Sequence, residues 1–228
     1  MTPGERLHAH LRSWLGAWPP PKGRLCVVGS ARREAPGWDG AIRPVLGVLT
    51  DSGGIVSVPP GVASDLDRRL GRAATITEGL AVAGGFLPHA LDRPDSHLGF
   101  GAFRWSRERT ESPAVGVWLP TTDPRVPEWL QPFNGDVLDA LDDDDRYQAG
   151  VGRKIHDPYG HELSVGTDPA HRNRGFARQL VMQATRRVLA GGAVATYLHD
   201  HANVASARVA EAFGFPDDGW QIVGLWSD

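Results

Sequence analysis

Apolar positions along the first part of the chain predict an α+β region. Residues 5–18 place leucines and tryptophans at helical spacing, and the three prolines at 19–21 end the predicted helix. Strand-like runs follow at 25–29, 44–50, 54–58 and 98–105, and helical patterns at 61–72 and 75–83. The polar, proline-terminated stretch 107–113 is the predicted linker to the second part of the chain.

The second part alternates strands and helices more closely. The predicted elements are strands at 114–119, 136–141, 147–155, 159–167, 193–199 and 220–226, and helices at 124–131, 174–190 and 203–213. Four aspartates at 142–145 separate two of the strands and predict a solvated hairpin turn. The order predicts an α/β fold with a mixed, mostly antiparallel central sheet and flanking helices. We therefore expect two regions, 1–112 and 113–228.

Composition narrows the class of protein. With 41% apolar residues, 22% charged residues and a formal net charge of −3, the chain reads as a globular protein without the overall basicity of a nucleic-acid binder. Its single cysteine, Cys26, lies in an apolar run and predicts a buried thiol. No apolar run approaches the ~20 residues that cross a bilayer, and the first residues lack the pattern of an export signal, so we expect a cytoplasmic protein with no membrane partner.

Residues 165–177 carry the main chemical signal. They run from the end of a predicted strand through a tight turn into a helix, where unpaired backbone N–H groups and the helix dipole favour phosphate oxygens. Gly175 and Ala177 leave room for a diphosphate to approach the backbone, and Arg172 and Arg174 add positive charge. The turn therefore predicts a phosphate-binding site.

Two stretches together resemble the GNAT superfamily of N-acetyltransferases. Residues 172–177 read Arg-x-x-Gly-x-Ala, which resembles the pyrophosphate-binding signature of that family. Residues 203–215 begin with Asn-x-x-Ser and end with Gly-Phe, which is similar to its second cofactor element. The resemblance covers 114–228. It implies the acyl-CoA N-acyltransferase fold there, while 1–112 could be a degenerate copy of the same domain or a cap over the acceptor site.

The resemblance also implies acetyl-CoA as cosubstrate. In the family, the strand before the phosphate turn and the strand after the helix splay apart, and the pantetheine arm lies between them as an added strand would. The positions carried over for cofactor binding are Val165, Gly166, Thr167, Arg172, Asn173, Arg174, Gly175, Phe176, Ala177, Asn203 and Ser206. Asn203 could equally be a helix cap that needs no ligand.

Three residues are candidates for proton transfer. Strand alternation places Tyr159, His161, Leu163 and Val165 on one face and Glu162 and Ser164 on the other. His161 is the first candidate for the base, because it matches a catalytic-side histidine of the arylalkylamine branch and titrates near neutral pH. Tyr159 is second, as a relay or replacement acid, and Glu162 is third, because a bulge could reverse the parity.

One position departs from the family pattern. Many members carry a tyrosine that protonates the leaving thiolate, and the matching residue here is Ala210. The leading hypothesis is an acyltransferase that moves the acetyl group to a primary amine of a small-molecule acceptor by direct attack. The alternative is a catalytically silent CoA-binding module. His199 and His201 flank the end of a strand, but no further ligand can be assigned, so no metal is expected. The protein could be a monomer or a homodimer.

Overall fold

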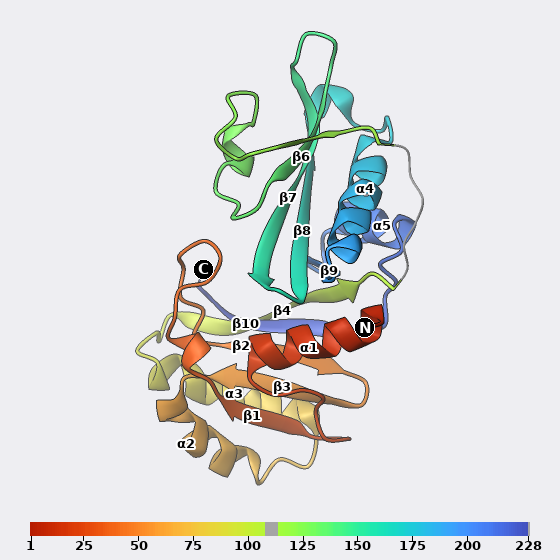
Figure 1. Ribbon diagram of the computed structural model, residues 1–228. Coiled ribbons are helices and arrows are strands. Elements are labelled where there is room, and N and C mark those ends of the chain that lie inside the picture. The colour runs from red at the N-terminus through yellow and green to blue at the C-terminus, as the bar shows by residue number, and fades with distance from the viewer. Residues whose placement is uncertain (108–113, 228) are drawn as a thin grey trace. The chain divides into compact units, whose positions relative to one another are not determined.

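The computed structural model describes residues 1–107 and 114–227 (Figure 1). These residues form two compact units. Unit 1 contains Met1–His10 and Arg104–Pro216, and unit 2 contains Leu11–Phe103 and Asp217–Asp228. The units therefore do not follow the boundary expected at residue 112, because the first ten residues pack within unit 1 and the last strand within unit 2. Most of the expected linker, 108–113, lies outside the described residues.

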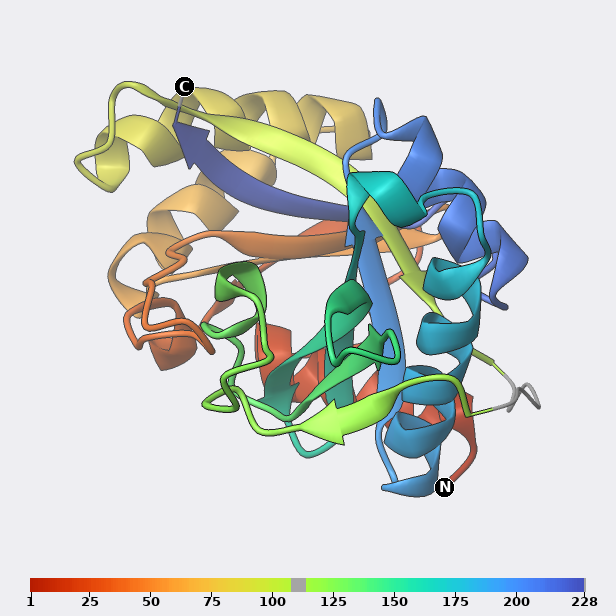
Figure 2. The ribbon, with the colours of Figure 1, turned by 90° about the horizontal axis from the view of Figure 1, so that it is seen from above.

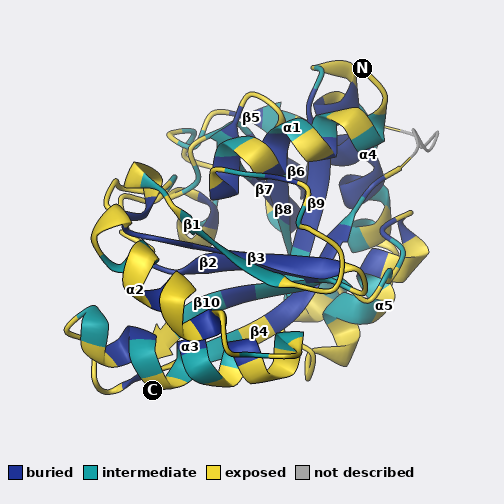
Figure 3. Ribbon diagram, turned by 90° about the horizontal axis from the view of Figure 1, so that it is seen from below, coloured by how far each residue is buried: buried dark blue, intermediate teal, exposed yellow. Residues whose placement is uncertain are grey.

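Unit 2 is a five-stranded sheet with two helices. Its strand order is β1-β3-β2-β10-β4, in which β1 and β3 are parallel and the other neighbours antiparallel. The elements are β1 (Leu25–Gly29), β2 (Leu46–Thr50), β3 (Gly53–Val58), α2 (Pro60–Leu70), α3 (Ile76–Ala90), β4 (Ser96–Trp105) and β10 (Gln221–Ser227), with a short 3₁₀ turn, η1 (Ala31–Arg33). Helices α2 and α3 bury one face and expose the other (Figure 3).

Unit 1 holds the remaining strands in the order β9-β8-β7-β6-β5. Strands β8 and β9 are parallel, and the others pair antiparallel. The elements are β5 (Val117–Leu119), η2 (Glu128–Leu130), β6 (Val137–Leu141), β7 (Tyr147–Asp157), β8 (Gly160–Thr167), η3 (Pro169–His171), α4 (Phe176–Ala190), β9 (Val194–His199) and α5 (Val204–Ala212). Helix α1 (Pro3–Leu15) begins in this unit. None of the helices formed by the described residues is long and apolar enough to cross a membrane.

Different segments of the chain pack on the two faces of the unit 1 sheet. Helix α4 packs on one face through a large apolar cluster that includes Leu138, Leu163 and Leu180. The η2 segment covers the opposite face through a smaller cluster that includes Leu130 and Val137. Viewed from above, α4 and the η2 segment lie on opposite sides of the strands (Figure 2). The sheet therefore separates two distinct environments.

Several sequence predictions hold, and some boundaries differ. The mixed, mostly antiparallel α/β class is confirmed, and the aspartates at 142–145 form the turn between β6 and β7, where the N–H of Asp142 donates to the carbonyl of Arg146 at 2.9 Å. The helix expected at 124–131 is wrong, because only the 3₁₀ turn η2 forms. Prolines at 124, 127 and 132 interrupt the backbone hydrogen bonding that a longer helix needs. The helix expected at 75–83 continues to Ala90.

Candidate active site

Strands β8 and β9 part within unit 1. Their parallel pairing joins Gly160 to Val194, His161 to Ala195 and Glu162 to Thr196. Among the described residues the pairing ends there, although β8 runs on through 163–167 and β9 through 197–199. The backbone groups of β8 beyond Glu162 therefore do not pair with β9, and an extended ligand could pair with them as a strand does. This is the splay that the family resemblance implies.

The turn after β8 is open at the start of α4. Asn173 and Gly175 adopt the left-handed backbone conformation, with φ values of 63° and 84°. Residues 172–175 are exposed, and a Cβ built on Gly175 would meet only the amide of Gln179, at 3.8 Å. The first helical hydrogen bond runs from the N–H of Gln179 to the carbonyl of Gly175. The preceding N–H groups of α4 thus lack helical partners and point toward a surface that could hold a phosphate.

Side chains of β8 alternate as the sequence predicts. Leu163 and Val165 pack in the cluster under α4, on the same side as His161. Glu162 points to the opposite side, where it pairs with Lys154 and lies 3.1 Å from Nε2 of His156. The two candidate bases therefore stand next to the splay on opposite faces of the sheet.

His161 is a neutral imidazole in this setting. Burial, together with the positive charge of Arg153, lowers its pKa to about 4. Its Nδ1 is buried and has no hydrogen-bond partner among the described residues. A neutral ring with a free nitrogen can accept a proton, although the low pKa makes it a weak base.

Glu162 is a buried carboxylate that keeps its charge. Burial by itself acts to raise its pKa, but the hydrogen bond from His156 and the charge of Lys154 outweigh burial and lower the pKa. Only 6% of the residue is exposed. Glu162 is also the last residue of β8 that pairs with β9, so the carboxylate marks the point of divergence.

Tyr159 lies just outside the strand. It belongs to the turn between β7 and β8, and 40% of the residue is exposed. Its N–H donates to Oδ1 of Asp157 at 2.8 Å, and its carbonyl accepts from the N–H of Val194 at 2.7 Å. Its position in a turn, before β8 begins, takes it out of the strand alternation on which its place beside His161 was based.

His10 of α1 supports the start of β8 and was missed by the sequence analysis. Its Nδ1 lies 2.9 Å from Oδ2 of Asp157, and both side chains are buried. Oδ1 of Asp157 also accepts from the N–H of Gly160 at 3.0 Å, and a Cβ on Gly160 would lie 2.1 Å from the His10 ring. The signal was present, since His10 falls on the apolar face of the helix with Leu7 and Leu11.

Helix α5 presents the second predicted cofactor element. The side chain of Asn203 accepts from the N–H of Ser206 at 2.9 Å, so Asn203 does cap the helix. Ala210 is fully buried in the cluster under α4. Tyr197 of β9, which the sequence analysis did not single out, is buried beside this helix. Burial raises the pKa of its phenol, and a hydrogen bond with Ser206 opposes that shift.

His199, the last residue of β9, is held by two hydrogen bonds. Nε of Arg104 donates to Nε2 of His199 at 3.1 Å, so the proton of a neutral His199 is on Nδ1, which lies 2.9 Å from the carbonyl of Asp200. Arg104 also pairs with Glu211 of α5 at 2.9 Å. Within the described part of the chain, no group of three or more potential ligands is placed to hold a metal.

Comparison with known proteins identifies the family of the chain. The profile of the acetyltransferase (GNAT) family matches residues 102–215, which is half of the chain. The chain belongs to the GNAT acetyltransferase family. No curated protein sequence matches it.

Solved structures resemble parts of this chain. A protein described as an acetyltransferase from the GNAT family of Novosphingobium aromaticivorans is 22% identical, with a TM-score of 0.50 over 59% of this chain and 68% of that one. A GNAT-family acetyltransferase from Colwellia psychrerythraea is 14% identical over 63% of this chain and 62% of that one, with a TM-score of 0.44. A GCN5-related N-acetyltransferase from Kribbella flavida is 15% identical over 80% and 86%, with a TM-score of 0.43. The first likeness establishes the acyl-CoA N-acyltransferase fold.

Proposed function

We propose that the protein transfers the acetyl group of acetyl-CoA to a primary amine of a small-molecule acceptor. The observation that carries the proposal is the splay of β8 from β9 beside an open, glycine-led helix start. A free strand edge suits the amides of pantetheine, and exposed N–H groups suit a diphosphate. Both features are needed for acetyl-CoA, and both lie in unit 1.

Different groups of residues would bind different parts of acetyl-CoA. The backbone of Val165, Gly166 and Thr167 would pair with the pantetheine arm and polarise the thioester carbonyl. The turn would hold the diphosphate through residues Arg172, Asn173, Arg174, Gly175, Phe176 and Ala177. Asn203 and Ser206 would border the pantetheine from α5.

Proton transfer would involve the residues beside the splay. His161 or Glu162, directly or through a water, would take the proton from the amine before it attacks the thioester carbon. Because the two side chains lie on opposite faces of the sheet, the face from which the acceptor enters decides between them. Tyr159 is the candidate acid for the departing thiolate. Tyr197 is a second candidate, since its raised pKa keeps the phenol protonated.

A silent CoA-binding module is the second candidate function. It is favoured by Ala210, which is buried where many family members carry the acid. Calorimetric titration with acetyl-CoA, combined with thiol release over a panel of primary amines, separates the two functions. Binding with turnover of at least one amine supports the transferase, binding with no turnover supports the silent module, and absence of binding refutes both.

A further inference from the structure

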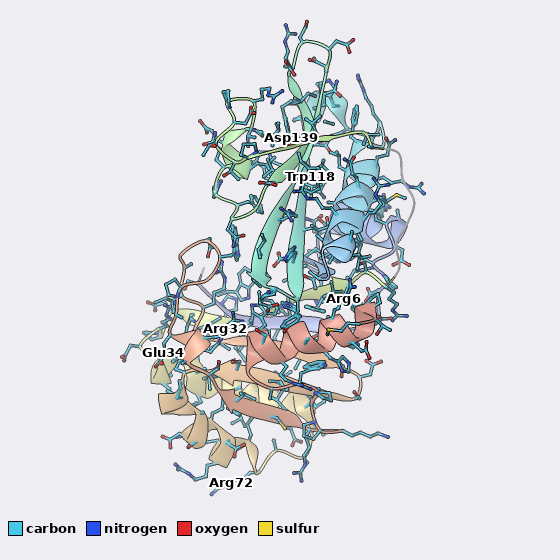
Figure 4. All side chains as sticks on the ribbon, viewed as in Figure 1. Arg6, Arg32, Glu34, Arg72, Trp118 and Asp139 are labelled. Carbon is cyan, nitrogen blue, oxygen red and sulfur yellow. The ribbon has the colours of Figure 1, made fainter. Side chains whose placement is uncertain are left out.

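Asp139 of β6 occupies a position where an apolar side chain would be expected. It lies between Val137 and Leu141 on the face that η2 covers, and it is fully buried. Leu130 and Val126 belong to the same apolar cluster. Figure 4 labels Asp139 among the strands of unit 1. Burying a carboxyl group in the middle of an apolar cluster costs free energy of folding, so its presence suggests that Asp139 has a functional role.

Both oxygens of Asp139 lack hydrogen-bond partners among the described residues. Burial raises its pKa to about 7, and the negative charge of Asp123 adds to the effect. Asp123 itself is held by Arg125 at 2.9 Å, and Tyr147 is a further titratable group that Asp139 influences. The described surroundings thus offer the carboxyl group no cation that would compensate its charge.

Three glycines extend from Asp139 along the same face of the sheet. Asp139 pairs with Gly150 and Gly150 pairs with Gly166, so Asp139, Gly150 and Gly166 lie in one row across β6, β7 and β8. A Cβ on Gly150 would lie 2.4 Å from Oδ1 of Asp139, so the carboxyl group leans over this strand. Gly152 lies two residues further along β7. Because glycines have no side chain, the backbone at Gly150, Gly152 and Gly166 forms a flat surface on this face of the sheet, which we call the floor.

Two aromatic rings, from η2 and from the residues just after it, cover this floor. A Cβ on Gly152 would lie 2.6 Å from the Phe133 ring, and one on Gly166 would lie 2.7 Å from the Trp129 ring. The two rings meet edge to face at 6.1 Å. Although Trp129 lies on the floor, 39% of the residue is exposed, and the turn that carries it has no side-chain cap. Between these rings, Leu130 is fully buried and its Cδ1 would lie 2.6 Å from a Cβ on Gly150. A ligand on this face would therefore have to displace the short apolar segment that carries these three side chains.

The floor leads from Asp139 to the splay. Glu162 lies four residues before Gly166 on the same face of β8, which is roughly 13 Å along the strand. Asp139 on β6 lies two strand spacings, or about 10 Å, from Gly166. A molecule stretched over the floor would reach the divergence point with one end and Asp139 with the other. Such a molecule would meet the carboxyl group of Asp139 close to the ring of Tyr147, since both lie within 3.0 Å of a Cβ built on Gly150. A carboxylate beside an aromatic ring is a favourable environment for an ammonium group.

We propose that Asp139 binds a second cationic group of the amine acceptor, on the order of 15 Å from the reacting nitrogen, in the place that Trp129, Leu130 and Phe133 now fill. The proposal deepens the proposed function and rests on it, since it assumes an amine acceptor. The substrate class is then a polyamine or another extended amine with two cationic ends. The acceptor would lie on the face of Glu162, which makes Glu162 rather than His161 the base.

The test measures binding of spermidine to the protein without acetyl-CoA. Titration calorimetry at pH 6.0 in two buffers of different ionisation enthalpy gives both the affinity and the protons released. Because Asp139 is mostly protonated at this pH, we expect binding of the cation to release most of a proton per cation bound. The Asp139→Asn variant should bind spermidine at least tenfold more weakly and release no proton. Asp143→Asn, on the exposed hairpin, is the matched control and should behave as the parent.

The proposal fails if spermidine does not bind, if Asp139→Asn binds it equally well, or if binding releases no proton. Acetyl-CoA titration of the same variants keeps this failure apart from failure of the proposed function. Asp139→Asn should bind acetyl-CoA as the parent does, which also shows that the variant is folded. Loss of acetyl-CoA binding in the parent would refute the transferase, whereas intact acetyl-CoA binding without a spermidine site would refute only the role of Asp139.

Discussion

Replacement of Asp139 should make the protein more stable at neutral and alkaline pH. Its pKa rises from 3.8 in an unfolded chain to about 7 in the folded protein, a difference of about 3 units at 1.36 kcal/mol each. The folded state thus binds this proton more tightly than the unfolded state. Stability from this group is fully present below about pH 4 and is lost as the pH rises through 7, to a total of roughly 4 kcal/mol.

Asp139→Asn and Asp139→Leu remove this titration. Relative to either variant, the parent should lose about 4 kcal/mol of unfolding free energy between pH 4 and pH 8, with the steepest loss between about pH 4.5 and 6.5. Leucine should stabilise more than asparagine at pH 8, because it completes the apolar cluster of Leu130 and Val137 without leaving a buried amide unsatisfied.

Urea unfolding of the three proteins at intervals between pH 4 and 9 measures the difference, and Asp143→Asn serves as the surface control. A carbon-detected NMR titration of the Asp139 carboxyl group gives its pKa directly. The reasoning is refuted if the parent and the variants lose stability in parallel with pH, or if the carboxyl group titrates near 4.

Three further outcomes are expected. Gly175→Ala should weaken acetyl-CoA binding by tenfold or more, whereas Gly192→Ala should not. Both glycines have positive φ and open surroundings, but only Gly175 lies at the start of α4. Calorimetry measures acetyl-CoA binding to both variants, and equal effects would contradict the assignment of Gly175 to the phosphate site. Gly160→Ala should destabilise the protein by roughly 2–4 kcal/mol, because the new methyl group would clash with the ring of His10. The same substitution should destabilise a His10→Ala variant much less. If thermal unfolding shows that the stability losses of the two single variants simply add in the double variant, the clash is excluded. If the acceptor instead enters from the face of His161, contrary to the site proposed at Asp139, His161→Gln should lower turnover of the best amine by ~10²–10⁴-fold, and the parent should lose activity only below about pH 5. A pH-rate profile with its acid limb near 6.5 would contradict the low pKa of His161.

Local sequence patterns predicted the elements that form the candidate site. The turn with Gly175 and the helix after it can be recognised from local sequence alone. Glycine can adopt the left-handed conformation of the turn, and apolar residues at helical spacing define the buried face of α4. The alternation of His161, Glu162 and Leu163 on β8 was predictable for the same reason. The short-range rules of strand and helix geometry set these features.

Long-range features were beyond such rules. Nothing near Asp157 shows that His10 will meet it, since 147 residues separate the two. The place of β10 between β2 and β4 depends on strand pairing that no local pattern specifies. Asp139 interrupts an alternating apolar run, which the sequence shows, but its isolation under η2 depends on how the proline-rich segment folds back.

The place of β10 has a consequence for synthesis of the protein. Strand β10 joins β2 to β4 in unit 2, yet residues 106–220 separate it from β4 along the chain. At 5–20 residues per second, a ribosome needs on the order of ten seconds to make that stretch. During this interval β2 and β4 each present an unpaired edge to other nascent chains, so unit 2 should depend on chaperones until the missing strand arrives.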